Sequence, residues 1–369
     1  MKPYFVYFCK RFLPDEFINE KYTLMTKQTQ FLNQLMTAPS VSGYEDEASK
    51  VFLNYVEPFA YQTEVDVLNN TYAFVGNPEA QTTVMVEAHI DEIGFQVLHI
   101  SKEGFLYIRK NGGVDLCCIP GSQVQVLAND GTVIPGVIGK KPIHLISADD
   151  RKKAPELDAL WVDTGLSEQE VRQRISVGDP VCFAPNVMML GEHKITSKGL
   201  DDKIGVYVVA EALRRLARKK LNVRVCGVAS SQEEVGCRGA VVGSANLEPD
   251  YAISLDVTFA TDVPDCSARK HGEVILGKGV VITKHLDSNR KFAQMAEKVA
   301  EEHKILHQLS ANNSATGGTN ASKIQLSNKG VRSLLLSIPN RYMHTPAEVC
   351  DMRDIDAAVE LIVELVSAL

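Results

Sequence analysis

Five short clusters of histidine and carboxylate side chains are the residues of this chain that could do chemistry. They are His89-Ile90-Asp91, Asp201-Asp202, Gln232-Glu233-Glu234, Asp256 and His344. We expect each cluster at or just after the end of a strand, where open α/β sheets build their sites.

The side-chain types in these clusters suit divalent metal ions. Two imidazoles with several carboxylates and no cysteine favour Zn, Co or Mn over a structural zinc site. That many acids converge only around a large positive charge, because unpaired carboxylates in a cleft repel one another. Two ions that share one bridging carboxylate would polarise a carbonyl and lower the pKa of a shared water, and a free carboxylate would then act as general base.

Three of the clusters, taken alone, also have an ordinary explanation. Asp201-Asp202 precedes an apolar run with helical spacing, so the pair could simply cap a helix. Glu233-Glu234 could be a solvated acidic loop. His89 and Asp91 lie two apart on a predicted strand and point the same way, so Asp91 could hydrogen-bond the His89 imidazole, or both could be solvated.

Length and composition indicate what kind of protein contains these clusters. The 369 residues, of which 45% are hydrophobic and 23% charged, predict two domains with real cores. The net charge of -7 argues against nucleic acid or an anionic membrane surface as partner. No apolar run approaches the ~20 residues of a membrane helix. Cysteines without C-x-x-C spacing indicate buried thiols in a reducing cytosol.

The predicted elements place a β segment inside an α/β domain. Helical spacing after residue 27 is followed by a second helix, for which Ser42 and Glu45 have the spacing of a capping box. Short strands follow up to residue 94, and residues 95–191 carry only β-like runs broken by turns. Strands and helices alternate from residue 192 onwards, including a helix predicted over residues 293–306. We therefore predict an α/β domain from residues 25–94 and 192–369, a β domain inserted at 95–191, and an appendage at 1–24.

The ordered motifs resemble those of the tetrahedral (TET) aminopeptidases, a family of co-catalytic metallopeptidases that includes glutamyl and deblocking aminopeptidases. The motifs are His89-Ile90-Asp91-Glu92-Ile93-Gly94, Asp201-Asp202-Lys203, Glu233-Glu234-Val235-Gly236, Asp256 and Arg341-Tyr342-Met343-His344-Thr345-Pro346. Their order and spacing agree from about Thr26 to the C-terminus. The resemblance implies a phosphorylase/hydrolase-like α/β/α metallopeptidase domain with an inserted PDZ-like β-barrel dimerisation domain.

The resemblance also implies a role for each site residue. Asp201 would bridge two divalent ions, Zn or Co, through a site at which the peptide to Asp202 is cis. His89 and Asp256 would complete one metal, and Glu234 and His344 would complete the other. Glu233 would be the general base acting on the bridging water, and Asp91 would orient His89.

The implied activity is removal of N-terminal residues from short peptides by a cytoplasmic enzyme that self-associates through the β insert, from dimers up to dodecamers. The alternatives are another hydrolase on the same two-metal scaffold (a dipeptidase, a deacylase or an endoglucanase-labelled relative) and a non-catalytic assembly scaffold. Two positions depart from the family pattern, which often has Arg at Lys203 and commonly Asp at Asn320. Asn320 leaves the substrate preference open.

Overall fold

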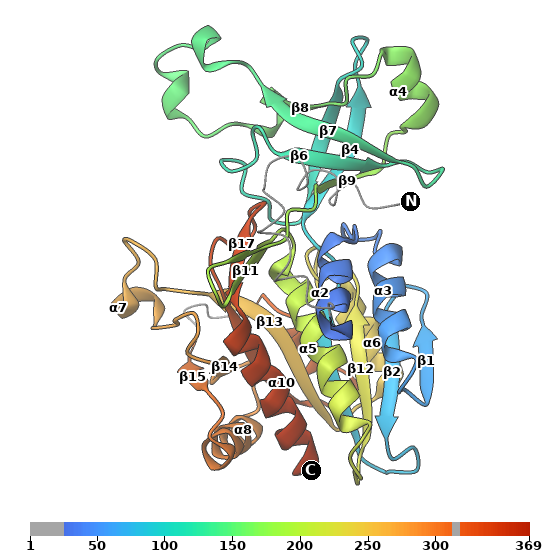
Figure 1. Cartoon of the computed structure of the whole chain (residues 1–369), viewed down its shortest axis with the longest axis vertical. Helices are drawn as coiled ribbons and strands as arrows, with labels where there is room; N and C mark the ends of the chain where they lie inside the picture. Colours follow the sequence, from blue (N-terminus) through green and yellow to red (C-terminus); the bar gives the residue numbers. More distant parts are fainter. Residues whose placement is uncertain (1–25, 312–317) are drawn as a thin grey trace, which may run out of the picture.

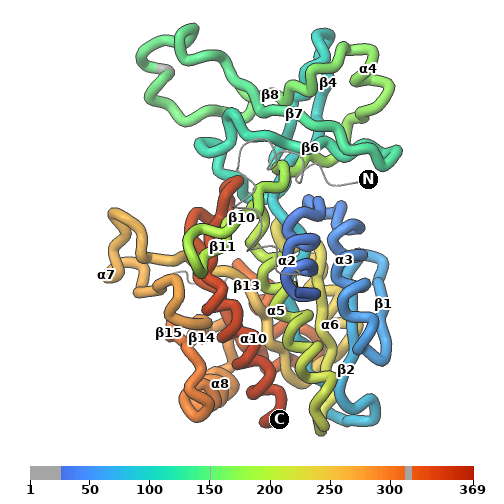
Figure 2. Tube along the Cα trace, in the orientation of Figure 1, coloured from blue at the N-terminus to red at the C-terminus, as the bar shows by residue number. Residues whose placement is uncertain are grey.

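A computed structural model describes residues 26–311 and 318–369 of the chain. The proposed appendage at residues 1–24 lies outside this range. The described chain forms a β-barrel, drawn at the top of Figure 1, above a sheet with helices on both faces. Figure 2 shows the backbone passing from the blue and cyan sheet strands into the barrel and returning in green.

The large sheet has eight strands in the order β1-β2-β12-β3-β13-β16-β14-β15. Their bounds are β1 (Gln62–Val65), β2 (Thr71–Gly76), β12 (Arg224–Ser230), β3 (Thr83–His89), β13 (Tyr251–Phe259), β16 (Arg332–Asn340), β14 (Val280–Thr283) and β15 (His307–Ser310). The four central strands β12, β3, β13 and β16 are parallel to one another. Their carboxyl ends therefore meet at one edge of the sheet, the edge that faces the barrel in Figure 1.

The barrel closes in the order β4-β5-β8-β7-β6-β9. Its strands are β4 (Gly94–Ile100), β5 (Leu106–Asn111), β8 (Leu160–Asp163), β7 (Val133–Lys140), β6 (Gln123–Leu127) and β9 (Pro180–Phe183), with α4 (Glu168–Arg174) beside them. Alternating apolar residues fill the interior as the β pattern predicts, and the rings of Phe95 and Phe183 meet edge to face at 5.7 Å. All six strands lie within residues 94–183, inside or at the border of the predicted insert.

Helices cover both faces of the large sheet. On one face lie α2 (Lys27–Thr37), α3 (Asp46–Val56), α5 (Leu200–Leu216), α8 (Arg290–His303) and α10 (Met352–Ser367). The other face carries α6 (Arg238–Leu247) and α9 (Ala321–Ile324). The remaining described helix, α7 (Ala268–His271), lies in an arm at the side of the sheet. This is the predicted α/β/α architecture.

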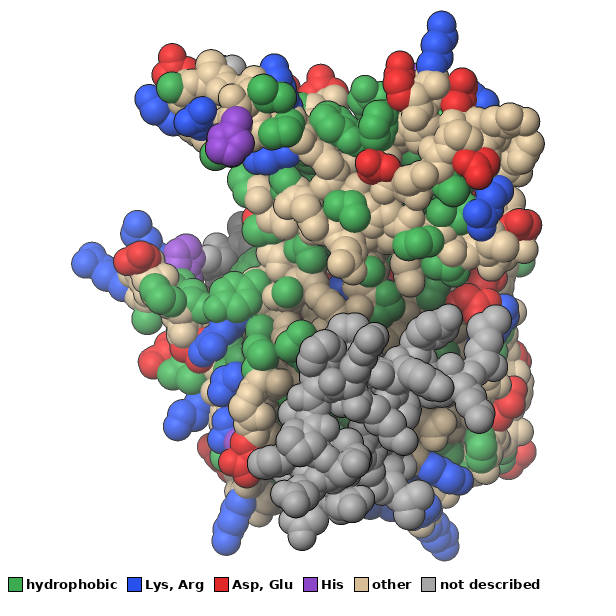
Figure 3. All heavy atoms as spheres, turned by 45° about the horizontal axis from the view of Figure 1, so that its top comes forward, with side chains coloured by type: hydrophobic (Ala, Val, Ile, Leu, Met, Phe, Trp, Pro, Cys, Tyr) green, Lys and Arg blue, Asp and Glu red, His purple; other side chains and the backbone are tan. Residues whose placement is uncertain are grey.

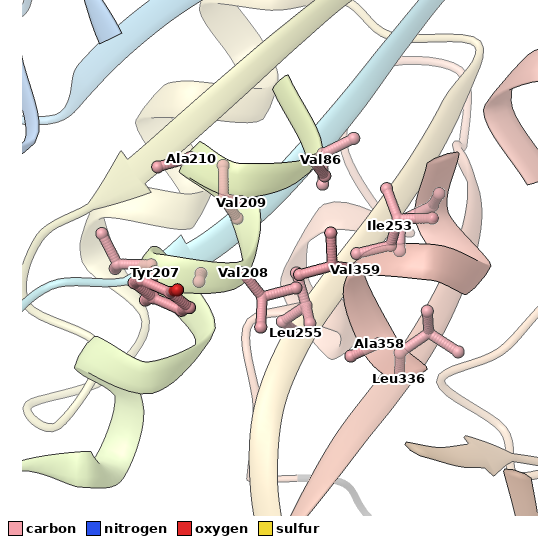
Figure 4. Packing of buried hydrophobic residues seen from close by; sticks show 14 of the residues in the cluster. Val86, Tyr207, Val208, Val209, Ala210, Ile253, Leu255, Leu336, Ala358 and Val359 are labelled. Carbon is pink, nitrogen blue, oxygen red and sulfur yellow. The ribbon is translucent and has the colours of Figure 1, made fainter. Parts of the chain in front are cut away.

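Helix α5 is central to the core because it carries apolar side chains on several faces. Figure 4 shows Val208 of α5 beside Leu255 of β13 and Val359 of α10. Gly227 of β12 lies directly under Val209 and Leu213, and a Cβ at this glycine would collide with the Leu213 side chain. This close packing holds α5 against the sheet.

Three local features differ from the predictions. Ser42 does not cap α3, which begins at Asp46 with Glu45 as its N-cap and no side-chain capping bond. The predicted helix over residues 293–306 ends at His303, because Lys304 takes a left-handed conformation (φ 58°), and His307 begins a strand. A three-stranded sheet of β10 (Met188–Leu190), β11 (Lys194–Ser197) and β17 (Glu348–Asp351), which the sequence did not reveal, lies beside the start of α5.

Candidate metal centre

The fold brings the five clusters to one place at the carboxyl edge of the sheet. His89 is the last residue of β3, and Asp256 lies in β13, its neighbour. Glu233 and Glu234 follow the end of β12, and His344 follows the end of β16. Asp201 comes from the start of α5, which begins against the same edge.

The side chains form two groups of three that share Asp201. One group is His89, Asp201 and Asp256, and the other is Asp201, Glu234 and His344, with the ligand atoms of each group within 4.8 Å of one another. Each oxygen of Asp201 faces a different histidine: Oδ1 is 3.1 Å from His89 Nε2, and Oδ2 is 3.3 Å from His344 Nε2. Among the described residues, these are the only groups of histidine, cysteine or acid with such geometry.

Both histidines have their second ring nitrogen next to a backbone carbonyl. Nδ1 of His89 is 3.1 Å from the carbonyl oxygen of Asp91, and Nδ1 of His344 is 2.9 Å from that of Gly113. A carbonyl can only accept, so Nδ1 carries a proton in each ring, and Nε2 is the nitrogen that can bind a metal once it has given up its own proton to make room for the ion. Both rings therefore present a metal-binding nitrogen towards Asp201.

Asp91 holds the acidic loop as well as His89. Its carboxylate is 3.4 Å from His89 Nδ1, and it accepts hydrogen bonds from the backbone N–H of Glu233 (2.9 Å) and of Glu234 (3.2 Å). The Ser42 hydroxyl donates a third bond at 2.6 Å. The partner of Ser42 is thus Asp91, not the helix that its sequence spacing suggested.

The electrostatics of the cluster fit a bound cation. Burial raises the pKa values of Glu234 and Asp256 well above normal, and the charge of Asp201 adds to the effect on both. Burial also raises the pKa of Glu233 to about 7. Burial opposes ionisation of Asp201 too, but hydrogen bonds from His344 and His89 outweigh it and lower its pKa. The buried Oε1 of Glu234 has no hydrogen-bond partner in the described residues. Carboxylates gathered in this way are stabilised by divalent cations.

One residue that the sequence did not reveal supports both sides of the site. Glu348, 1% exposed, accepts the backbone N–H of Asp201 at 2.8 Å and that of His344 at 3.0 Å. Nothing local marked this residue, because its contact with Asp201 spans 147 positions of sequence.

The two departures from the family pattern occupy buried positions. Lys203 donates to the Ala38 carbonyl at 2.6 Å and lies 3.1 Å from Glu92. The amide nitrogen of Asn320 donates to Glu87 at 2.6 Å and to the Ser230 hydroxyl at 3.0 Å. Both side chains therefore bind acids that lie within two residues of Asp91 or His89 in the sequence.

Comparison with known proteins agrees with this geometry. The profile of the M42 glutamyl aminopeptidases matches residues 69–361. A lysyl aminopeptidase of Pyrococcus furiosus is 34% identical over 339 residues, covering 90% of this chain and 94% of that protein.

Two solved structures show that the similarity extends to the three-dimensional fold. A TET aminopeptidase from the marine sediment archaeon Thaumarchaeota archaeon SCGC AB-539-E09 has a TM-score of 0.88 at 31% identity, covering 93% of this chain and 96% of that one. The TET1 peptidase of Pyrococcus horikoshii, which can assemble into a tetrahedron or a large octahedral shell, has a TM-score of 0.82 at 30% identity, covering 93% of this chain and 100% of that one. The chain belongs to the M42 glutamyl aminopeptidase family and is a metal-dependent peptide hydrolase.

Proposed function

We propose that this chain removes N-terminal residues from short peptides with two divalent ions, and that Asp201 lies between them. The observation that carries the proposal is the sharing of Asp201 by two groups of ligands, with one carboxylate oxygen turned to each histidine. In this assignment His89 and Asp256 complete one position, and Glu234 and His344 complete the other. Two imidazoles with carboxylates, and no cysteine, favour Zn or Co.

Glu233 is the general base of the proposed mechanism. Divalent ions held by these residues would supply the Lewis-acid chemistry of the reaction, polarising the scissile carbonyl and lowering the pKa of the attacking water. The Glu233 carboxylate takes a proton from that water and delivers it to the nitrogen of the leaving peptide. A pKa of about 7, raised by burial, suits a group that must accept and then release a proton near neutral pH. Asp91 holds Glu233 in place through the backbone N–H of that residue.

The proposed assembly proceeds through the barrel. In the proposed division of the chain, residues 95–191 form the dimerisation domain, and residues 25–94 and 192–369 form the catalytic domain. Support comes from exposed apolar side chains on the barrel, some of which are visible in green in the upper part of Figure 3. They include Leu98, Val133, Val137, Ile143 and Leu145. We propose dimers, and dodecamers built from them, by analogy with the relative PhTET1-12s, whose solved structure has a dodecamer in the asymmetric unit.

We place the enzyme in the cytoplasm. In support, seven cysteines of the described chain are free, four of them buried, as expected in a reducing compartment. In the described residues, no helix is long and apolar enough to cross a membrane.

The test is hydrolysis of a panel of aminoacyl-anilides after chelation and after addition of Co or Zn. We expect activity to disappear with the metal, to return with it, and to require a free amino group, because an aminopeptidase rejects N-acylated substrates. The panel would also show which N-terminal residue is preferred. If two ions bind but no anilide is hydrolysed, the substrate class is wrong, and dipeptides, acylated amines and cellulose derivatives are tested next. A protein that binds no metal would refute the proposal.

Glu233→Gln provides the matched variant. The amide cannot take a proton from water, so kcat should fall by at least about 100-fold, while metal content and assembly remain those of the natural chain. Retained turnover in this variant would exclude Glu233 as the base. Lost turnover with normal assembly would exclude a purely structural role for the protein.

A further inference from the structure

We propose that the barrel forms part of the metal centre, because the loop that follows β5 holds His344 in place. This inference rests on the proposed two-metal function. It concerns residues 112–115, which belong to the barrel part of the chain and lie far in sequence from Glu234 and His344, the proposed ligands that they contact.

The contact between this loop and His344 is double. The Gly113 carbonyl accepts the Nδ1 proton of His344 at 2.9 Å, and the Asp115 N–H donates to the His344 carbonyl at 3.2 Å. The loop therefore fixes both the ring and the backbone of the residue. His344 also has a positive φ of 63°, a conformation that needs such support outside glycine.

The two glycines of the loop are needed at their positions. A Cβ on Gly113 would lie 2.7 Å from His344 Nδ1, closer than such atoms can approach. A Cβ on Gly112 would lie 3.3 Å from Glu234 Oε2 and 2.8 Å from the side chain of Ile93. The loop backbone thus lies directly against both ligands that are specific to the second metal position.

The first metal position has no such dependence. The Nδ1 proton of His89 is held by the Asp91 carbonyl, only two residues along the same segment, whereas Gly113 and His344 are 231 residues apart. The His89 side chain is 2% exposed and that of His344 is 33% exposed. One position is therefore built within the sheet, and the other is built across the junction between sheet and barrel.

A metal titration of Gly113→Ala tests the inference directly. The added methyl group must displace the His344 ring. We therefore expect one ion to bind as in the natural chain and the other about 10- to 100-fold more weakly, the range seen when partners of a ligating histidine are removed. The readouts are isothermal titration of metal-free protein with Zn, and the visible spectrum of the Co-loaded form, which reports the coordination of each ion.

Gly139→Ala is the matched control. Gly139 lies on β7 of the same barrel, and its added Cβ would also be 2.7 Å from a ring nitrogen, that of Trp161. This variant disturbs the barrel to a similar degree without touching a ligand, so both ions should bind as before. If the two variants weaken the binding of an ion equally, the effect comes from a general disturbance of the barrel, and the inference is wrong.

A second variant guards against misfolding of Gly113→Ala. Asn111→Ala removes the bond from the Asn111 amide to the Ser42 carbonyl (2.8 Å), which anchors the base of the loop, and adds no atoms. It should weaken the same ion in the same direction by a smaller factor. If Gly113→Ala, folded by circular dichroism, or Asn111→Ala binds both ions with natural affinity, the loop does not position His344. If the natural chain itself binds fewer than two ions, the two-metal function fails instead.

Discussion

Glu348 links the two ligands that come from opposite ends of the catalytic segment. One of its oxygens accepts the N–H of Asp201 and the other that of His344, so a single buried carboxyl group sets the spacing of the two backbones. Burial, together with the nearby charge of Asp201, raises its pKa to about 8. Both donors are backbone N–H groups, so Glu348 supplies the side chain in each of these two bonds.

Replacement of Glu348 by Gln should lower the activity of the site without preventing metal binding. The amide keeps one acceptor oxygen but turns an NH2 group towards the other N–H, and a buried N–H without an acceptor costs about 1–3 kcal/mol. We expect kcat/KM to fall roughly 10- to 100-fold at saturating metal, with the melting temperature lowered. Steady-state kinetics and thermal unfolding check this, and unchanged values for both would show that the two N–H groups need no common acceptor.

The candidate ligands could be predicted from the sequence because their residue types bind metals. Residues that act only through a contact with a distant part of the chain could not be predicted. His89, Asp201, Glu234, Asp256 and His344 are ligand types at strand or helix ends, and the structure brings them together. Glu348 and Gly113 act through backbone groups of distant residues, and no local spacing records such contacts.

At the scale of elements, the segment between α2 and α3 joins the barrel to the site. Ser42 donates to Asp91, and its carbonyl accepts from Asn111 of β5. Tyr44 donates to the Gly178 carbonyl and accepts from Gln96 of β4. Glu45 accepts the N–H of Gln232, the residue before the proposed base.

Removal of one hydroxyl from this segment should slow the catalysed reaction. Ser42→Ala deletes the 2.6 Å bond to the Asp91 carboxylate, which then holds Glu233 and Glu234 less firmly. We expect kcat to fall several-fold with little change in KM, and stability to fall by about 1 kcal/mol. Ser42→Thr, which restores the hydroxyl, should recover most of the activity.

Ser49→Ala is the control for this change. Ser49 is equally buried in the neighbouring helix α3, but its hydroxyl has no hydrogen-bond partner in the described part of the chain. Its removal should leave kcat unchanged. Similar losses of kcat in both variants would mean that the Ser42–Asp91 bond has no special role.

The elements themselves were predictable where their hydrophobic period was strong. The helix after Asp201 and the buried strands around Val86 and Leu255 appear close to where the pattern placed them. The sheet of β10, β11 and β17 escaped prediction because its strands have only three or four residues, and because β11 pairs with β17 over about 150 positions of sequence. The helix predicted over residues 293–306 was placed too late in the chain, since α8 runs from Arg290 to His303 and periodicity does not register a left-handed residue such as Lys304.

At the scale of the whole molecule, buried acids make the stability of the metal-free chain depend on pH. Burial raises the pKa of Glu45 to about 8, with a further contribution from Asp91, and that of Glu348 also to about 8, against 4.5 for the free side chain. The folded chain therefore holds protons that the unfolded chain releases between these values. His344, whose pKa a hydrogen bond to Asp201 raises to about 10 from 6.5, acts in the same direction.

The sign of the effect follows from proton linkage. Because the folded state binds more protons, the free energy of unfolding should decrease as the pH rises from 5 to 8, by more than about 1 kcal/mol. Bound divalent ions favour the ionised carboxylates and should flatten this slope. Urea unfolding with chelator, and again with Zn, measures both slopes. A metal-free chain that is equally or more stable at pH 8 than at pH 5 would contradict the assignment.

The order of the strands in the sheet determines when the enzyme can first become active. The proposed ligands of the first position are complete once Asp256 has been synthesised, but the proposed second position requires His344, which follows β16. This strand lies inside the sheet, between β13 and β14, so the sheet itself stays open until β16 has been synthesised. A chain that has grown only as far as Asp256 can therefore not assemble the second position. A peptidase built in this order stays inactive until the last of its proposed ligands, His344, has been added.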